Sequence, residues 1–383
     1  MKLSAMKLKF AKIYLIISLI GLFGQVMAQE YTLEKSGDTN IQIDFETSFN
    51  GSGFIEDEEH YYFLDGNSDN IHIAIINKSN LVQIDNIYLY KEGPSGIKNP
   101  MSLVLIDKNI GVYEFYSGKI KVIDKEGKVL KTFETKKNNP SSIGVMPLFM
   151  NPILNLDQQL IITQIAGIDY QTGLINYTNP VIKFFDLPTE KQTSILNYPE
   201  NYKNPLAGGR HSFFSYTKND NEKELVVSFP IDHNLYHIKN KQIKKVKVEG
   251  AIFESFENHY FGSFGDLKDL DYNKIKWKFW NSHSYGLLVF DPYREVYYRE
   301  VKLPIKNPES LPQDAKEGKH RDYVILIYDK DFKFLGKSGI IENVNLTMSG
   351  GNYFISKAGL HLFKADQDNE DLMQFNTYKL KRK

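Results

Sequence analysis

The sequence predicts an all-β protein, a six-bladed β-propeller built from four-stranded blades. Two kinds of hairpin repeat along the chain, and the aspartates that mark one kind recur at residues 57, 107 and 157, which lie 50 residues apart. A repeat of this length with four strands in each unit is typical of a propeller. The 24 Tyr and 25 Phe, together with Ile and Val in alternating runs, favour strands throughout the chain.

The first 28 residues have the pattern of a cleaved signal peptide. Four lysines precede an apolar run that extends from Ile13 to Phe23, and Ala28 ends the segment with a small residue. A retained membrane anchor is the alternative, but this run is short for a helix that spans a bilayer. We therefore expect cleavage before Gln29, which leaves residues 29–383 as a single propeller domain.

The composition limits the cell compartments and the partners expected for the mature domain. Cleavage would remove four of the 47 basic residues and none of the 47 acidic ones, so the mature chain carries slightly more acid than base. Such a balance argues against nucleic acid as a partner. The chain contains no Cys, which excludes disulfides, thiolate metal sites and a lipid anchor on an N-terminal Cys. We expect an exported protein that is periplasmic or extracellular, and a monomer.

Five hairpins share one design, in which two strands of alternating apolar residues flank a polar turn. They are NIHIAIINKSNLVQIDNIYLY (70–90), KIKVIDKEGKVLKTFE (119–134), PVIKFFDLPTEKQTSILNYP (180–199), NLYHIKNKQIKKVKVEG (234–250) and YVILIYDKDFKFLGKSGI (323–340). Each would supply the two outer strands of one blade.

A second hairpin precedes each of these five and would supply the two inner strands. Four of them hold an Asp between their strands, in GFIEDEEHYYFL (53–64), LVLIDKNIGVYEF (103–115), ILNLDQQLIITQI (153–165) and LLVFDPYREVYYREV (287–301). FFSYTKNDNEKELVVSF (213–229) fits as the fifth, with a longer turn around Asp220. The aspartates of the tight turns are most simply turn formers.

The last unit lacks one strand. Residues 343–363 and 372–380 supply three strands before the chain ends, while residues 31–48 form a strand-like run with no blade of its own. We expect this N-terminal strand to complete the last blade and close the ring, because closure removes exposed sheet edges. Seven blades are the main alternative, with the extra blade in residues 251–283. An open stack of hairpins or a sandwich would lack the 50-residue repeat.

Three stretches of the sequence resemble a known family. They are HSYGLLVFDPYREVYYREVKLP (283–304), GGNYFISKAGLHLF (350–363) and the signal-like N-terminus. Together they are similar to bacterial exported proteins of unknown function, six-bladed propellers related to the TolB-like and NHL-like superfamily. The resemblance implies the same fold but brings no catalytic residues. Many relatives carry a lipobox Cys that this chain lacks.

The long insertions are predicted to gather on one face of the ring. In a propeller, the loops between the second and third strands and those between blades open on the same face, and here both kinds are long. They are residues 134–152, 166–179, 199–210, 250–282 and 304–320. The other face would carry the short turns. Loops on a rigid scaffold often carry binding residues, so we expect the ligand site on the long-loop face.

Two of these loops end alike and supply the candidate site residues. GGRHSFFSY (208–216) and WNSHSYGLL (280–288) each place His-Ser before an inner strand, so His211 and His283 are expected at the mouth of the channel with Arg210, Trp280 and Tyr285. An aromatic residue beside His and Arg suits a sugar ring or an anionic group. The alternative is that each His caps its strand through backbone hydrogen bonds.

Other motifs provide weaker evidence for metal, catalytic or ion-pair sites. His233 and His237 in DHNLYH are spaced to share a strand face, but no third ligand accompanies them. The chain has no G-x-S-x-G and no phosphate-binding glycine motif. In YREVYYREV (293–301), Arg294 and Arg299 are placed to pair with acids. We expect no cofactor, and nothing in the sequence supports Ca²⁺.

The function predicted from these features is non-catalytic recognition of a glycan, a peptide or an envelope protein. The alternative is a propeller enzyme, a lyase or a lactonase-like hydrolase with His and acidic residues at the channel mouth. Propellers host both classes, so the fold does not decide between them.

Overall fold

The protein is described through a computed structural model, and the description covers most of residues 29–383. The described residues are 30–43, 53–66, 71–93, 96–135, 152–164, 167–168, 175–202, 213–254, 256, 282–305, 321–342, 344, 353–364, 369 and 371–383. The predicted signal peptide lies outside them, as do most of the long insertions.

The described strands form one 12-stranded sheet, three four-stranded sheets and one small hairpin. Single parallel bridges from β1 link three antiparallel groups of four strands into the 12-stranded sheet, so the strands fall into six four-stranded sheets. The first sheet contains β2 (Gly53–Glu56), β3 (His60–Gly66), β4 (Ile71–Asn77) and β5 (Val82–Leu89), and the second contains β6 (Pro100–Ile106), β7 (Asn109–Glu114), β8 (Lys119–Ile123) and β9 (Val129–Glu134). The third contains β10 (Leu154–Leu156), β11 (Gln159–Thr163), β14 (Ile182–Asp186) and β15 (Gln192–Ile195). The order within each sheet is the order of the sequence, as expected for blades.

The remaining sheets follow the same plan with one exception at the end of the chain. The fourth sheet contains β16 (Ser215–Asn219), β17 (Glu224–Ser228), β18 (Leu235–Lys239) and β19 (Gln242–Val246), and the fifth contains β20 (Ser284–Asp291), β21 (Val296–Lys302), β22 (Tyr323–Asp329) and β23 (Phe334–Lys337). The sixth contains β24 (Tyr353–Ser356), β25 (Gly359–Phe363), β26 (Leu372–Arg382) and β1 (Tyr31–Gln42).

The N-terminal strand pairs with the C-terminal strand, as expected from the unpaired run at residues 31–48. β1 lies antiparallel to β26 from Tyr31 opposite Arg382 to Gln42 opposite Leu372. The strand ends at Gln42, so residues 44–48 of the predicted run lie outside the described part of the chain. β1 also touches the outer strands of both flanking sheets, at Gly336 of β23 and Val82 of β5.

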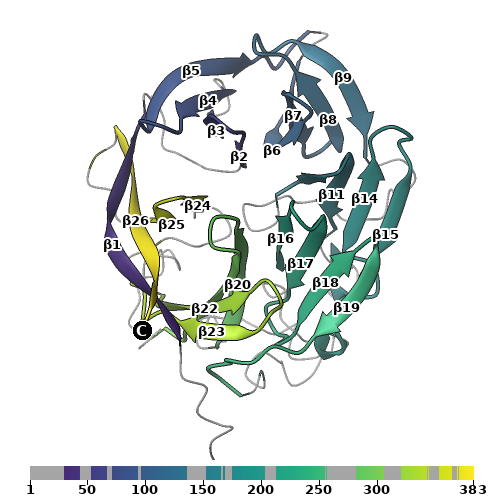
Figure 1. The fold of residues 1–383 in the computed structure, drawn as a ribbon. Coiled ribbons are helices and arrows are strands. Elements are labelled where there is room, and N and C mark those ends of the chain that lie inside the picture. Colours follow the sequence, from purple (N-terminus) through teal and green to yellow (C-terminus); the bar gives the residue numbers. More distant parts are fainter. Residues whose placement is uncertain are drawn as a thin grey trace, which may run out of the picture.

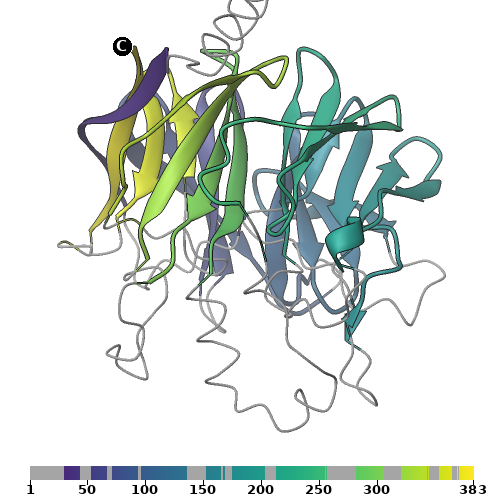
Figure 2. The same ribbon diagram turned by 90° about the horizontal axis from the view of Figure 1, so that it is seen from below.

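The sheets are arranged around a common centre, which makes the protein a β-propeller (Figure 1). The first strand of each sheet lies nearest the centre and the fourth lies outermost. Figure 2 shows the same sheets from the side, with their strands running between the two faces of the ring. The all-β propeller fold predicted from the sequence is therefore confirmed.

The core lies between neighbouring sheets rather than within any one of them. Phe133 and Phe185 meet edge to face between the second and third sheets, with ring centroids 5.8 Å apart. Tyr61 and Phe354 meet between the first and sixth sheets at 5.1 Å. Each buried aromatic side chain of this kind stabilises the fold by roughly 2–3 kcal/mol through removal of apolar surface from water. The alternating aromatic residues of the sequence thus hold adjacent blades together.

The aspartates predicted to form turns do so in two ways. Asp57, Asp291 and Asp329 use a side-chain oxygen to accept backbone N–H bonds within their own turns, at 2.7–3.2 Å. Asp107 and Asp157 instead occupy the left-handed region, with φ of 55° and 52°. Asp tolerates that region better than most residues and suits a two-residue hairpin turn.

Two short elements interrupt the long insertions and were not predicted. The strands β12 (Gly167–Ile168) and β13 (Ile175–Asn176) form a separate hairpin between β11 and β14. The 3₁₀ turn η1 (Glu200–Tyr202) follows β15 and buries the ring of Tyr202 against Tyr177 and Tyr198. In the described part of the chain, no helix has the length and apolar character needed to cross a membrane.

Candidate functional site

A cavity of about 550 Å³ lies at the centre of the ring and is the candidate site. The inner strands β2, β6, β10, β16, β20 and β24 all contribute to its wall. Tight-turn residues Asp107, Asp157, Asp220 and Pro292 also line it, so the cavity extends toward the short-turn face. The ring geometry explains this position, because six strands that converge on one axis leave space between their inward side chains.

The polar wall of this cavity centres on Asn155 of β10. Its Nδ2 donates to the carbonyl of Leu105 at 2.9 Å, while its buried Oδ1 has no hydrogen-bond partner among the described residues. Lys218 of β16 donates to the carbonyl of Asn155 at 3.1 Å and pairs with Asp220 at 2.9 Å. A buried acceptor without a donor lowers the stability of a fold by about 1–3 kcal/mol. The Oδ1 atom of Asn155 can therefore accept a hydrogen bond from a ligand.

The carboxylates at the edge of the cavity differ in their surroundings. Glu56 pairs with Lys78, and Asp157 pairs with Lys223 at 2.9 Å. Asp107 is exposed and makes no ion pair within the described ranges. Lys218 is the one lysine among the described residues of the wall, and it is already bound to Asp220. An anionic ligand would therefore meet excess negative charge here and little free positive charge.

Aromatic side chains supply much of the remaining wall. They are Phe54, Tyr216, Phe290, Tyr353 and Phe354. Burial raises the pKa of Tyr216 well above the usual value for tyrosine, and its hydroxyl donates to the carbonyl of Pro152. Burial, with a smaller effect from the Glu56 charge, also raises the pKa of Tyr353. Both phenols are therefore neutral at physiological pH and present rings with polar tips.

This wall is suited to a neutral polyhydroxyl ligand. Aromatic faces contact the apolar faces of a sugar ring, while carboxylate and amide oxygens accept bonds from hydroxyl groups. Among the described residues, no group of three or more His, Cys, Asp or Glu side chains is placed to hold a metal ion. In the part of the chain that the structure describes, no His contributes to the wall of the cavity.

The structure places only part of the site predicted from the sequence. Arg210, His211 and Trp280 lie outside the described residues, so their approach to one another stays a prediction. His283 is half-buried and stacks on Phe253, with ring centroids 4.9 Å apart and an interplanar angle of 10°. Burial, and to a smaller extent the charge of Arg321, lowers the pKa of His283.

Tyr285 packs between two sheets and does not line the central cavity. Its side chain is almost fully buried, and its hydroxyl bonds to Nδ1 of His233 at 2.7 Å. The guanidinium carbon of Arg299 lies 3.4 Å from the centre of its ring. The structure thus brings His283 and Tyr285 into one aromatic cluster with Phe253. The contacts described for both side chains are to other residues of the domain core.

Arg299 is a residue whose role the sequence did not reveal. It was expected to pair with an acid, but its guanidinium donates to Ser228 Oγ at 2.8 Å and to the carbonyls of Asp232 and His233 at 2.6 and 2.7 Å. It therefore fastens the β17–β18 turn to β21 of the next sheet. Arg294 does pair with an acid, Asp291, at 2.8 Å.

The two histidines of DHNLYH do not act together. His233 precedes β18 and bonds to Tyr285, whereas His237 lies within β18 and bonds through Nε2 to Glu224 at 2.6 Å. Burial lowers the pKa of His233. Because their partners differ, the structure gives no support to a shared metal site.

Comparison with known proteins places the chain in a family. A family profile described as a domain of unknown function, DUF4221, matches residues 29–339. The chain belongs to the DUF4221 family. This confirms the resemblance to bacterial exported propellers of unknown function. None of the curated proteins matches the sequence.

Solved structures share the fold of this DUF4221 protein. A DUF4221 member from Bacteroides vulgatus superposes with a TM-score of 0.72 at 19% identity, over 93% of this chain and 99% of the other. A putative exported protein from Bacteroides fragilis gives 0.53 at 13% identity, over 94% and 97%. At these identities the likeness shows the fold alone.

Proposed function

We propose that this DUF4221 protein is a non-catalytic recognition protein that binds a neutral sugar chain in its central cavity. The observation that carries the proposal is the cavity wall, where inner strands of all six described sheets combine aromatic faces with Asn155 and the rim carboxylates. The unpartnered Oδ1 of Asn155 and the exposed Asp107 would accept hydroxyl hydrogens. Phe54 and Tyr353, which line the cavity and are only partly buried, would contact the sugar ring.

The proposed architecture is a closed ring of six blades. Support comes from the six described four-stranded sheets and from the pairing of β1 with β26. In this arrangement β1 is the fourth strand of the last blade, so one blade holds both ends of the domain. Such a closure fixes the diameter of the channel and hence the size of the cavity.

The proposal includes export and removal of residues 1–28. A lysine-rich start and a short apolar run support a cleaved signal, and the structural neighbour from Bacteroides fragilis is described as a putative exported protein. An exported protein of this kind would meet glycans at the cell envelope or outside the cell. Peptides and envelope proteins are the other partners expected from the sequence, on the long-loop face.

The competing proposal is an enzyme whose catalytic residues lie at the long-loop mouth. Arg210, His211 and Trp280 would supply them together with His283. Three of the described histidines favour recognition, because His233 and His237 are tied to Tyr285 and Glu224 and His361 is buried. Among the described residues, the wall of the central cavity carries no His, and three of its four acids are paired with lysines.

Titration calorimetry with defined tetrasaccharides tests the proposal. The probes are chitotetraose, cellotetraose and maltotetraose as neutral ligands, and tetragalacturonic acid as an anionic one. We expect the mature domain to bind at least one neutral probe and to reject the anionic one. Asn155→Leu should weaken that binding about tenfold or more, because a hydrogen bond in a desolvated site contributes roughly 1.4 kcal/mol.

Two further variants test whether the sugar binds in the central cavity. Asp107→Asn changes an exposed rim residue without touching the core, and it should also weaken binding. Asp331→Asn changes an exposed acid in the β22–β23 turn, outside the cavity, and should leave binding unchanged. Binding of tetragalacturonic acid alone, or neutral binding that is equally strong in all three variants, would refute the central cavity as a neutral-sugar site.

A further inference from the structure

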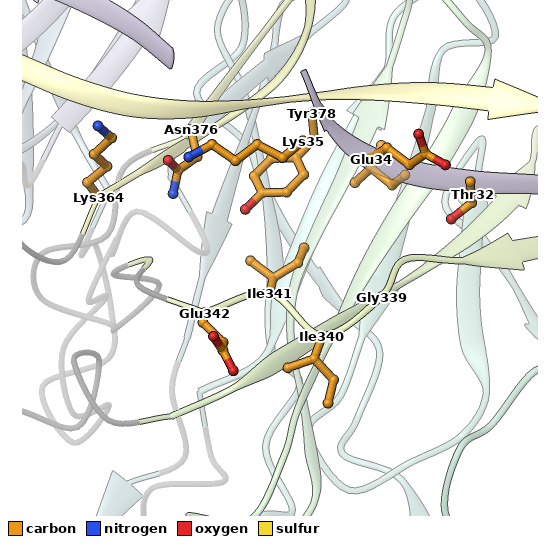
Figure 3. A pocket seen from close by; sticks show the side chains of 11 residues that line it. Thr32, Glu34, Lys35, Gly339, Ile340, Ile341, Glu342, Lys364, Asn376 and Tyr378 are labelled. Carbon is orange, nitrogen blue, oxygen red and sulfur yellow. The ribbon is translucent and has the colours of Figure 1, made fainter. Parts of the chain in front are cut away.

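A second cavity of about 700 Å³ lies at the outer edge of the ring, between the fifth and sixth sheets. One wall is the start of β1, from Thr32 to Lys35, and the other is the segment Gly339 to Glu342 that follows β23. Figure 3 shows the two walls with Asn376 and Tyr378 directed from β26 toward the segment. We call this cavity the lateral groove.

The two walls of the lateral groove diverge from a common point. Tyr31 pairs in parallel with Gly336, and the Thr32 hydroxyl donates to the carbonyl of Lys337 at 3.2 Å. Beyond these contacts β1 continues along β26, while the chain after Lys337 stays close to β22. Each wall offers four residues, which in an extended chain span about 13 Å.

The segment wall presents an open strand edge. Ile341 exchanges both of its backbone hydrogen bonds with Tyr323, at 2.8 and 3.1 Å. In an antiparallel pair, the backbone groups of the flanking residues then point to the opposite side. The amides and carbonyls of Ile340 and Glu342 therefore face away from β22, and no backbone bond to them occurs within the described residues. Such an edge can pair with an added strand.

Asn376 is the polar group at the base of the groove. Its side chain is 4% exposed, and its Oδ1 has no hydrogen-bond partner among the described residues. A native fold seldom leaves a buried amide oxygen without a donor. An amide side chain carries one acceptor and two donors, which is the set needed to bond a peptide group from the side.

The remaining groups of the groove carry charges of both signs. Lys35 and Lys364 both bind Asp38, at 3.1 and 2.9 Å, which lowers the pKa of Asp38 chiefly through the Lys364 bond. Glu342 is exposed on the opposite wall. Asp38 balances one of the two lysine charges, and Glu342 on the opposite wall offsets the other, so the groove has no strong preference for a charged ligand. Ile340 is 58% exposed at the rim and offers apolar contact.

We propose that the lateral groove binds an extended peptide by strand addition. The peptide backbone would pair with Ile340 and Glu342, a peptide group would bond to the Asn376 amide, and an apolar side chain would rest on Ile340. This site is separate from the central cavity. A sugar would satisfy Asn376 but would leave the open strand edge unpaired, so the edge favours a peptide over a sugar.

Selection from a phage-displayed library of random heptapeptides tests this inference. The mature domain should enrich peptides, and a fluorescein-labelled copy of the most enriched sequence then reports binding by polarisation. Asn376→Leu should weaken binding tenfold or more. A copy of the peptide methylated at alternate backbone nitrogens should also lose binding, because strand addition needs those N–H groups.

Matched variants distinguish loss of peptide binding at the lateral groove from misfolding and from binding in the central cavity. Asn376→Asp keeps the shape of the side chain and removes its donors, so it should also weaken binding even if Asn376→Leu melts early. Asn86→Leu, on the outer strand β5, and Asn155→Leu, in the central cavity, should leave peptide binding unchanged. The inference is overturned if no peptide is enriched, if Asn155→Leu abolishes binding while both Asn376 variants retain it, or if methylation has no effect.

Discussion

At the scale of the residue, the stability of this propeller depends on polar groups placed between sheets. Arg299 is fully buried and satisfies carbonyls of the neighbouring sheet while its guanidinium covers the ring of Tyr285. A buried guanidinium persists only when its donors find acceptors. Arg299 therefore fixes the distance between the fourth and fifth sheets, which in turn determines where Tyr285 and His233 meet.

His361 is a second buried polar residue and carries a prediction about pH. It stacks on Phe354 with ring centroids 4.0 Å apart, and its Nε2 and Nδ1 bond to Ser356 and Thr377 at 2.8 and 3.1 Å. Burial, with a smaller effect from the charge of Arg294, lowers its pKa from 6.5 to about 4. Between pH 6.5 and pH 4, His361 therefore binds a proton in the unfolded chain but stays neutral in the folded protein.

We expect the free energy of unfolding to fall as the pH decreases from 6.5 to 4. The full stabilising contribution is present above pH 6.5, and its loss should reach about 3 kcal/mol at pH 4. Urea denaturation of His361→Gln should show a flatter dependence over this range, because Gln does not titrate. Equal slopes for the two proteins would show that His361 does not control the acid sensitivity.

Sequence reasoning succeeded for residues whose role is local. The turn aspartates were predictable, because an Asp between two alternating runs acts on its own turn. Arg299, Asn155 and Asn376 were not predictable, because their partners or cavities come from segments distant in the sequence. A period-two pattern reports which face of a strand is buried, but it does not report how deep a side chain lies in a channel.

At the scale of the element, β1 is the strand with the most distant partner. It pairs with β26 along its whole length and buries Leu33 and Ile41, which are 3% and 0% exposed. The sequence predicted this pairing from a count of strands. The last unit has three strands and the N-terminus has one strand without a blade, so the N-terminal strand was expected to complete the last blade. The hairpin β12–β13 escaped prediction, because two-residue strands leave no periodic pattern.

Removal of β1 should destabilise the whole domain. A chain that begins at residue 44 would expose β26 and lose the burial of Leu33 and Ile41, which together contribute about 5 kcal/mol or more. Calorimetric melting should show a large loss in Tm for the truncated chain. A synthetic peptide of residues 30–43 should restore part of it, whereas a scrambled peptide should not. A truncated chain that melts with the full mature domain would contradict the role assigned to β1.

At the scale of the whole molecule, the ring contains two cavities of different character. The central cavity forms where all six inner strands converge, and the lateral groove forms where β1 leaves β23. The fold class and the order of strands followed from the 50-residue repeat and the turn residues. The position of the cavity did not follow, because it depends on side-chain size at the channel rather than on loop length. The predicted site at the long-loop mouth falls mainly outside the described residues.

The central claim is that the propeller recognises a neutral sugar without changing it. Mass spectrometry of the tetrasaccharide that binds, recovered after prolonged incubation with the mature domain, tests this claim most directly. The account predicts a single species of unchanged mass, because three of the four acids that line the described wall, Glu56, Asp157 and Asp220, are already paired with lysines. Products with an added water, or shorter chains with an unsaturated end, would identify a hydrolase or a lyase and contradict the account.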